Sequence, residues 1–210
     1  MRHLIIIGAG GYGRETFGVA LGACGYGTDF DVRGFLDARP DALAGFAGYP
    51  PVIGSPETYV PEAEDVFVTA LGDIASRRKC AELVSAHGGK FIPLVHRSAV
   101  LGPHVVIGEG TLVAPNVFVS ADVRLGRHAA VFHGTSVGHD AVLGDFSHVY
   151  AQCSIGGGVR LGEGAVVYPG SVVTPRRTIG AAAVVGAGST VFLNVRDGET
   201  VIGNPAKPVR

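Results

Sequence analysis

The sequence has few cysteines, almost no net charge and no long hydrophobic run. Its three cysteines, Cys24, Cys80 and Cys153, are odd in number and far apart, and no Cys-x-x-Cys pair occurs, so neither a disulfide framework nor a zinc knuckle is expected. The net charge of −1 provides no general attraction to nucleic acid or to an anionic membrane. The apolar start, Leu4 to Ile7, is too short for a signal sequence or a membrane span. We therefore expect a cytoplasmic protein with no nucleic-acid and no membrane partner.

A six-residue repeat fills the second half of the chain. Every sixth residue from Val95 to Val191 is aliphatic, and a small or β-branched residue stands four positions after almost every one of them. Glycine often follows the aliphatic position directly, as at Gly102 and Gly126. A period of six fits neither an amphipathic helix nor an open strand, and it indicates a parallel β-helix of hexapeptides. We expect three hexamers to close one triangular coil, with the aliphatic and small side chains inside and glycine at φ > 0 corners.

The alternative for this repeat is a Gly/Val-rich sandwich or barrel, whose strands do not keep one phase over such a length. The clear break in the pattern is Arg177, which occupies an inward position. A buried, unpaired arginine is costly, so we expect the corner to bulge outward there. Whether Arg176, Arg177 and Lys207 meet phosphate groups or are solvated surface charge stays open at this stage.

The first part of the chain reads as a βαβ unit. A buried strand from His3 runs into Gly8, Gly10 and Gly13, which match G-x-G-x-x-G, and then into a helix. This arrangement presents backbone N–H groups and a helix N-terminus to phosphate. A second strand ends in Asp37, at the distance where such folds place a carboxylate on a ribose hydroxyl. Further strands are expected at 66–71, leading to Gly72, and at 91–95. Only one half of a Rossmann fold fits into this length, which favours a nucleoside diphosphate and its sugar over NAD.

Four histidines lie in the middle of the repeat: His128, His133, His139 and His148. His139 and His148 fall at outward phases, so we expect them at the surface and not in the core. For His128 and His133 an ordinary surface role is equally possible. The segment from His139 to His148 stands out because the surrounding repeat consists of residues with little chemistry.

These motifs together carry a family resemblance. The hexapeptide array ends in Gly-Asn-Pro-Ala-Lys207, the N-terminal turn reads Gly-Ala-Gly-Gly-Tyr-Gly-Arg14, and His139-Asp140 is followed by Gly144-Asp-Phe-Ser-His148. The chain resembles the PglD and NeuD group of left-handed β-helix acyltransferases, which comprises nucleotide-sugar N-acetyltransferases and sialic acid O-acetyltransferases. The resemblance implies a half-Rossmann domain at 1–94, a left-handed β-helix at 95–195 and a closing tail at 196–210. It also implies a homotrimer with acetyl-CoA bound between neighbouring subunits, and no metal.

The resemblance also assigns site residues. His139 would be the general base, Asp140 its acidic neighbour and His148 a second active-site histidine. Nucleotide-sugar contacts would come from Gly8, Gly10, Gly11, Tyr12, Gly13, Asp37, Ala38 and Gly72, although the family often has histidine where this chain has Tyr12. Acetyl-CoA contacts would come from Gly157, Gly158, Pro169, Gly186 and Lys207, with a backbone N–H of the 156–158 run near the thioester oxygen. Because adjacent residues on an extended side point to opposite faces, we do not expect Asp140 to touch the His139 ring.

The implied activity is transfer of the acetyl group of acetyl-CoA to the amine of a nucleotide-linked amino sugar, such as a 4-amino-4,6-dideoxy sugar. Histidine suits the role of base, and no covalent intermediate is required because no cysteine or serine stands beside a base. An O-acetyltransferase acting on sialic acid or another sugar is the nearest alternative. A γ-carbonic-anhydrase-like zinc enzyme would need a third histidine beside His128 and His133, and none stands at a matching phase upstream. A non-catalytic nucleotide-sugar-binding or structural trimer is the remaining alternative.

Overall fold

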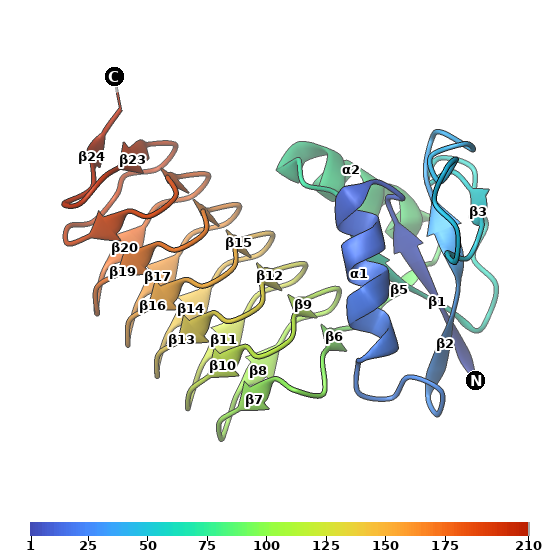
Figure 1. The fold of residues 1–210 in the computed structure, drawn as a ribbon, viewed down its shortest axis with the longest axis horizontal. Helices are drawn as coiled ribbons and strands as arrows, with labels where there is room; N and C mark the ends of the chain where they lie inside the picture. The colour runs from blue at the N-terminus through green and yellow to red at the C-terminus, as the bar shows by residue number, and fades with distance from the viewer. Residues whose placement is uncertain (210) are drawn as a thin grey trace. The chain divides into compact units, whose positions relative to one another are not determined.

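The computed structural model describes residues 1–209 and divides the chain into two compact units, Met1–Val95 and His96 onward (Figure 1). The boundary follows the change from βαβ pattern to hexapeptide repeat. No helix within residues 1–209 is both long and apolar enough to cross a membrane.

The first unit is a parallel sheet with the strand order β3-β2-β1-β4-β5. Its elements are β1 (Arg2–Ile7), α1 (Gly11–Leu21), β2 (Phe30–Leu36), β3 (Val52–Gly54), β4 (Asp65–Thr69), α2 (Ile74–Ala86) and β5 (Lys90–Phe91). The central β1 supplies a fully buried run from Leu4 to Ile7. The crossover from β1 to β2 through α1 and the crossover from β4 to β5 through α2 run in opposite directions along the sheet, so right-handed connections place α1 and α2 on opposite faces.

Two details of this sheet differ from the expectation. The strand expected at 91–95 is interrupted between β5 and β6 (Leu94–Val95), because Pro93 has no N–H to donate to a ladder. The short edge strand β3 has no periodic pattern of its own, and the sequence did not predict it. Its register with β2 shifts between Phe35 and Leu36.

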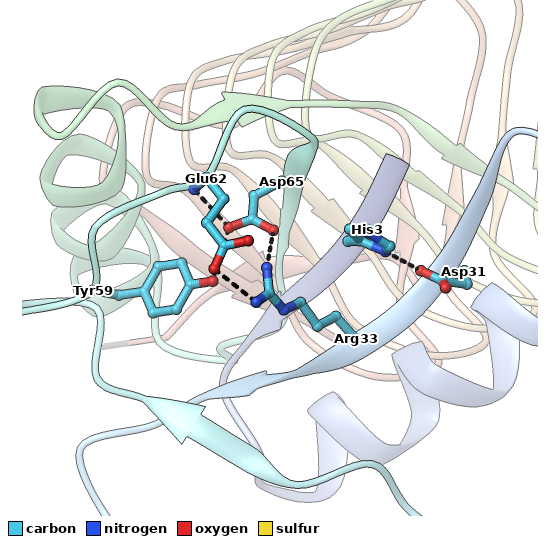
Figure 2. A network of polar contacts seen from close by, with 6 residues as sticks. All are labelled: His3, Asp31, Arg33, Tyr59, Glu62 and Asp65. Atoms are coloured by element: carbon cyan, nitrogen blue, oxygen red, sulfur yellow. Dashed lines mark hydrogen bonds and ion pairs between the residues drawn. The ribbon is translucent and has the colours of Figure 1, made fainter. Parts of the chain in front are cut away.

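A polar network fastens the N-terminal edge of the sheet (Figure 2). The Arg33 guanidinium donates to Asp65 Oδ1 at 2.9 Å and to Glu62 Oε1 at 2.7 Å, and the Tyr59 hydroxyl donates to Asp65 Oδ2 at 2.8 Å. The Asp65 side chain is fully buried. Burial raises its pKa, but the hydrogen bonds from the Glu62 N–H and Tyr59 and the Arg33 charge outweigh burial and hold the pKa below its ordinary value.

Replacing Asp65 by asparagine should destabilise the first unit by about 1–3 kcal/mol at neutral pH, since a buried hydrogen-bonded charge is lost. A lowered folded-state pKa contributes stability above the ordinary carboxylate pKa, and this stability disappears as the pH falls through the folded pKa. The difference in melting temperature between wild type and Asp65→Asn should therefore shrink as the pH falls below about 4. A difference that stays constant down to strongly acidic pH would show that the Asp65 charge does not stabilise the fold.

The second unit is the predicted parallel β-helix, built from two-residue strands on three flat sides (Figure 1). The eight-stranded side contains β6, β9 (Leu112–Val113), β12 (Ala130–Val131), β15 (His148–Val149), β18 (Val166–Val167), β21 (Val184–Val185), β23 (Thr200–Ile202) and β24 (Lys207–Pro208). The six-stranded side contains β7 (Val100–Leu101), β10 (Phe118–Val119), β13 (Ser136–Val137), β16 (Ser154–Ile155), β19 (Val172–Val173) and β22 (Thr190–Val191). The five-stranded side contains β8 (Val106–Ile107), β11 (Arg124–Leu125), β14 (Val142–Leu143), β17 (Arg160–Leu161) and β20 (Thr178–Ile179).

The core of the β-helix follows the repeat. From Val113 to Val191 every aliphatic repeat position is buried, and so are small positions such as Ala141 and Cys153. Leu101, in the first coil, is 40% exposed because no coil lies below it. The tail continues the architecture, since β23 pairs in parallel with β21 and β24 returns antiparallel on β23. Arg177 is half-exposed and its Nε donates to the Pro175 carbonyl at 3.2 Å, so this inward phase does not hold a buried charge.

The expected role of the repeat glycines is wrong. The residues with positive φ stand three positions after the aliphatic residue, and many are not glycine, among them Asp122, Asp140 and Gln152. The glycines directly after the aliphatic position have no positive φ. A Cβ on Gly126 or Gly162 would lie only 2.6 Å or 2.4 Å from a backbone nitrogen of the next coil. Close stacking of the coils, and not corner geometry, therefore requires glycine there.

Candidate active site

The glycine turn after β1 forms the first candidate site. Gly8 has φ +103°, and a Cβ on it would lie 2.7 Å from the Ala70 carbonyl oxygen, so both conformation and space require glycine. Gly10 caps α1, and a Cβ on Gly10 or Gly11 would meet no atom within 4 Å. The helix N-terminus and its N–H groups thus face open space at these two positions. This is the arrangement that binds phosphate.

Gly13 has a packing role. A Cβ built on Gly13 would lie 1.9 Å from the Gly8 carbonyl oxygen, inside the contact between α1 and the turn. Gly13 is buried, so a diphosphate could not reach it without displacing the turn. Our expectation that Gly13 contacts the nucleotide therefore has little support from the geometry, and its neighbours Gly10 and Gly11 are better placed.

Asp37, at the end of β2, holds the glycine turn. Its Oδ2 accepts from the Ala9 N–H at 2.9 Å, and its Oδ1 accepts from the Arg39 N–H at 3.0 Å and from Arg39 Nε at 3.2 Å. Burial raises the pKa of Asp37, but the two backbone N–H groups and the Arg39 guanidinium outweigh it and keep the pKa below its usual value. Asp37 is therefore ionised at neutral pH, and a carboxylate in this state accepts hydrogen bonds only.

A pocket of about 200 Å³ opens beside this turn. Its lining includes three of the expected nucleotide-site residues, Gly8, Asp37 and Ala38; the other five, Gly10, Gly11, Tyr12, Gly13 and Gly72, do not line it. The sequence did not point to the other polar lining residues, Arg39, Glu57, Ser76 and Cys80. Ser76 and Cys80 are four residues apart on α2, and this spacing in the sequence indicates that they share one face of the helix. Burial is the main cause that raises the pKa of the Cys80 thiol, and the Glu57 charge adds to it. The thiol is therefore neutral and forms part of the pocket wall.

The pair Gly10 and Gly13 offers a direct test of this site. Gly10→Ala should lower the melting temperature only slightly, because alanine is a poorer helix N-cap than glycine but the φ of −71° suits it and the surroundings are open. If a diphosphate binds at this turn, the added methyl group obstructs it, and the KM for a sugar nucleotide should rise about tenfold. Gly13→Ala should instead destabilise the fold by about 3 kcal/mol. An unchanged KM in a stable Gly10→Ala protein would place the diphosphate elsewhere.

The second candidate site lies on a corner of the β-helix, where His139 and Asp140 interact directly. The distance from His139 Nδ1 to Asp140 Oδ2 is 2.7 Å, and both side chains are mostly exposed in the single chain. Our expectation that these side chains diverge is wrong. Asp140 has φ +60°, so the chain turns there and does not continue as an extended strand. The left-handed turn brings adjacent side chains together on the outside of the corner.

The hydrogen bond determines which nitrogen of His139 is available for chemistry. An ionised carboxylate only accepts, so Nδ1 donates to Asp140 and Nε2 keeps its free lone pair. Nε2 lies directly above Gly157 of the next coil, where a Cβ would come within 2.7 Å of it. Glycine at 157 therefore gives the imidazole its position.

The run Gly156-Gly157-Gly158 leaves this corner without side chains next to the His139 ring. The Gly156 N–H donates to the Val173 carbonyl at 2.9 Å, and the Gly158 N–H donates to the His139 carbonyl at 2.8 Å. Within residues 1–209 the Gly157 N–H has no acceptor. The corner thus combines an oriented imidazole, an available amide donor and a run of three residues without side chains.

His148 differs from the expectation of a surface histidine. It points outward on β15, yet it is only 1% exposed because its ring packs against both Phe132, at 4.9 Å, and Tyr150, at 4.3 Å between ring centroids. His128 is similarly buried, stacked on Phe146 at 4.8 Å, whereas His133 is exposed. Outward phase does not guarantee exposure when large aromatic side chains of adjacent coils cover the same face.

One chain does not bring all the expected site residues together. His139, Asp140, Gly157 and Gly158 share the corner between the six-stranded and the five-stranded side. His148 belongs to the eight-stranded side, and Pro169 and Gly186 follow strands of that side. Lys207 lies on β24 and is exposed. Within residues 1–209 no three His, Cys, Asp or Glu side chains are placed to hold a metal ion.

A hexapeptide β-helix that follows a parallel sheet with a glycine turn has the fold of a β-helix acyltransferase. Comparison with known proteins supports the same fold. Residues 3–84 match the PglD N-terminal domain family. A mutant of perosamine N-acetyltransferase from Caulobacter crescentus, solved with CoA and GDP-perosamine, is 31% identical with a TM-score of 0.90, over 100% of this chain and 98% of that chain.

Two further relatives extend the comparison. The acetyltransferase domain of PglB from Neisseria gonorrhoeae, solved with acetyl coenzyme A, is 32% identical with a TM-score of 0.87, over 99% of each chain. GDP-perosamine N-acetyltransferase from Escherichia coli is 31% identical over 64% of this chain, and the aligned stretch spans 61% of that relative. The chain belongs to the PglD family of nucleotide-sugar N-acetyltransferases, and its coil is their left-handed β-helix.

Proposed function

We propose that this protein transfers the acetyl group of acetyl-CoA to the amine of a nucleotide-linked amino sugar, such as a 4-amino-4,6-dideoxy sugar. The observation that carries the proposal is the His139–Asp140 pair with Nε2 held above Gly157. Acyl transfer to an amine requires a base for the proton that the amine loses and a donor for the oxyanion, and this corner offers both. The names of the relatives support the substrate class, since they include GDP-perosamine and UDP-N-acetylbacillosamine N-acetyltransferases.

In the proposed reaction the sugar amine attacks the thioester carbonyl and a C–N bond forms. His139 Nε2 accepts the proton from the amine, while Asp140 holds the Nδ1–H and stabilises the imidazolium. The Gly157 N–H donates to the tetrahedral oxyanion. Collapse of the intermediate breaks the C–S bond, and the leaving thiolate of CoA takes up a proton. No enzyme-bound acyl group is required.

We propose that the nucleotide of the acceptor binds at the first unit. The open turn at Gly10 and Gly11, together with the N-terminus of α1, suits the diphosphate. The pocket beside Asp37 and Ala38 suits the nucleoside. This unit favours a nucleotide-linked acceptor over free sialic acid, because free sialic acid has no diphosphate for the turn. Such a role fits a cytoplasmic step in the synthesis of a surface glycan.

We further propose that the working protein is a homotrimer with shared active sites. Gly157 and Gly158 lie at the corner beside His139, whereas Pro169 and Gly186 follow strands of the eight-stranded side, so an acetyl-CoA site that uses both groups needs a second chain. Pro169 and Gly186 of one subunit would then complete the acetyl-CoA groove at the Gly157 corner of its neighbour.

Light scattering should return three times the chain mass of 21.5 kDa. The trimer should persist in His139→Ala, since His139 is exposed and its removal takes no contact from the core. A wild-type protein that is monomeric while fully active would contradict the shared site.

A panel of acceptors tests the function itself. UDP-, dTDP- and GDP-linked 4-amino sugars, with free sialic acid as the hydroxyl acceptor, should be compared by release of CoA. At least one nucleotide-linked amine should be acetylated far faster than sialic acid. Preferential transfer to sialic acid would establish the O-acetyltransferase alternative.

A further inference from the structure

One arginine shares the catalytic corner with the His139–Asp140 pair. The left-handed residues of successive coils stack in a column on this corner: His104, Asp122, Asp140, Gly158 and Arg176. Adjacent coils are about 4.8 Å apart, so the Arg176 Cα lies about 10 Å along the corner from that of Asp140. Gly158, between them, has no side chain. The corner therefore has a gap, with the acid–base pair on one side and Arg176 on the other.

The stem of Arg176 contacts Gly158. A Cβ built on Gly158 would lie 3.5 Å from Arg176 Cγ, an ordinary contact distance, so no side chain at position 158 separates the arginine from the acid–base pair. The next residue behaves differently, since Arg177 Nε donates to the Pro175 carbonyl at 3.2 Å. Sequence alone did not separate the two arginines.

The charge of Arg176 is available to a ligand. Within residues 1–209 neither a hydrogen bond nor an ion pair engages its guanidinium. Arg127, on the next corner of the β-helix, is by contrast held by Asp145 at 2.7 Å. A guanidinium presents several N–H donors in a plane and matches phosphate oxygens better than any other side chain.

The geometry points to Arg176 as a phosphate-binding residue of the acyl-transfer site. This inference rests on the proposed function, because the phosphate belongs to one of its two substrates. Acetyl-CoA carries a diphosphate and a further phosphate beyond its pantetheine arm, and the acceptor carries a diphosphate on its sugar. Both present the same chemistry to Arg176, and kinetics distinguishes them.

The experiment compares Arg176→Met with wild type, using acetyl-CoA and S-acetylpantetheine, a donor without the diphosphate. Methionine keeps an unbranched stem over Gly158 and removes only the charge. If Arg176 binds CoA, the KM for acetyl-CoA should rise about 10- to 100-fold while the rate with S-acetylpantetheine stays unchanged. If it binds the acceptor, the KM for the nucleotide sugar should rise by this factor with either donor. Arg176→Lys should recover part of the loss, and the matched control Arg177→Met should behave as wild type.

Two results would overturn the inference. One is a variant whose KM values are both unchanged. The other is a fall in kcat that is equal with both donors at unchanged KM values, which would put Arg176 on the reacting atoms instead. Calorimetric titration with CoA, GDP, UDP and dTDP separates this inference from the proposed function, since it needs no turnover. A wild type that is inactive with every acceptor would contradict the proposed acetyltransferase activity. Equal affinities of wild type and Arg176→Met for every compound would contradict the role of Arg176.

Discussion

Replacing His139 by alanine should lower kcat by about 10² to 10⁴ at neutral pH, the usual contribution of a positioned general base. The melting temperature should stay close to that of wild type, because the His139 side chain is 70% exposed and makes no core contact. Asp140→Asn should lower kcat less and should leave the trimer intact.

The matched control for this change is His133→Ala, which removes an exposed histidine from another corner, one hexamer earlier. It should retain nearly full activity. If His133→Ala abolished activity while His139→Ala kept it, the base would have been assigned to the wrong hexamer. Chelators should affect none of these proteins, which separates a histidine base from a zinc enzyme.

Gly157→Ala should abolish most activity in a protein that still folds. The added methyl group would lie 2.7 Å from His139 Nε2 and 2.9 Å from Cε1, so the imidazole must move away. The ring belongs to an exposed side chain and can move at little cost in stability. A displaced base and a partly blocked Gly157 N–H should together lower kcat by about 10² or more. Alanine already stands one coil below His139 in this column, at Ala121, so the backbone tolerates it.

Gly138→Ala is the control for Gly157→Ala, because it should affect stability. Its methyl group would lie 2.5 Å from the Gly157 backbone nitrogen, and backbone cannot move aside as an exposed ring can. We expect a clear drop in melting temperature for Gly138→Ala and almost none for Gly157→Ala. If Gly157→Ala kept wild-type kcat, the position of His139 above Gly157 would have no part in catalysis.

The fold was predictable because one residue pattern repeats without interruption. A valine such as Val137 carries little information alone, but its recurrence every six residues identifies stacked coils and the side chains inside them. The roles of the glycines were not predictable, because a left-handed corner and close stacking of the coils both favour glycine. Gly138 proved to be a stacking glycine, whereas Asp140 takes up the left-handed corner.

The candidate site was predictable in its residue types and only partly in its geometry. The contact between His139 and Asp140 depends on the φ of Asp140, which a period-two reading of the strand misses. The burial of His148 depends on Phe132 and Tyr150, which stand in two different coils. The packing role of Gly13 depends on a helix crossing the turn at Gly8. In each case the decisive neighbour comes from backbone geometry or from a distant part of the sequence.

The most direct test of the central claim is mass spectrometry of the sugar nucleotide after incubation with acetyl-CoA. Wild type should add one acetyl group to a nucleotide-linked 4-amino sugar. The acetyl group should be on the amine nitrogen, and one CoA should be released per product. His139→Ala, compared at equal trimer concentration, should give at most about one hundredth of that product in the same time. Acetylation of a hydroxyl in place of the amine, or equal product from both proteins, would contradict the account.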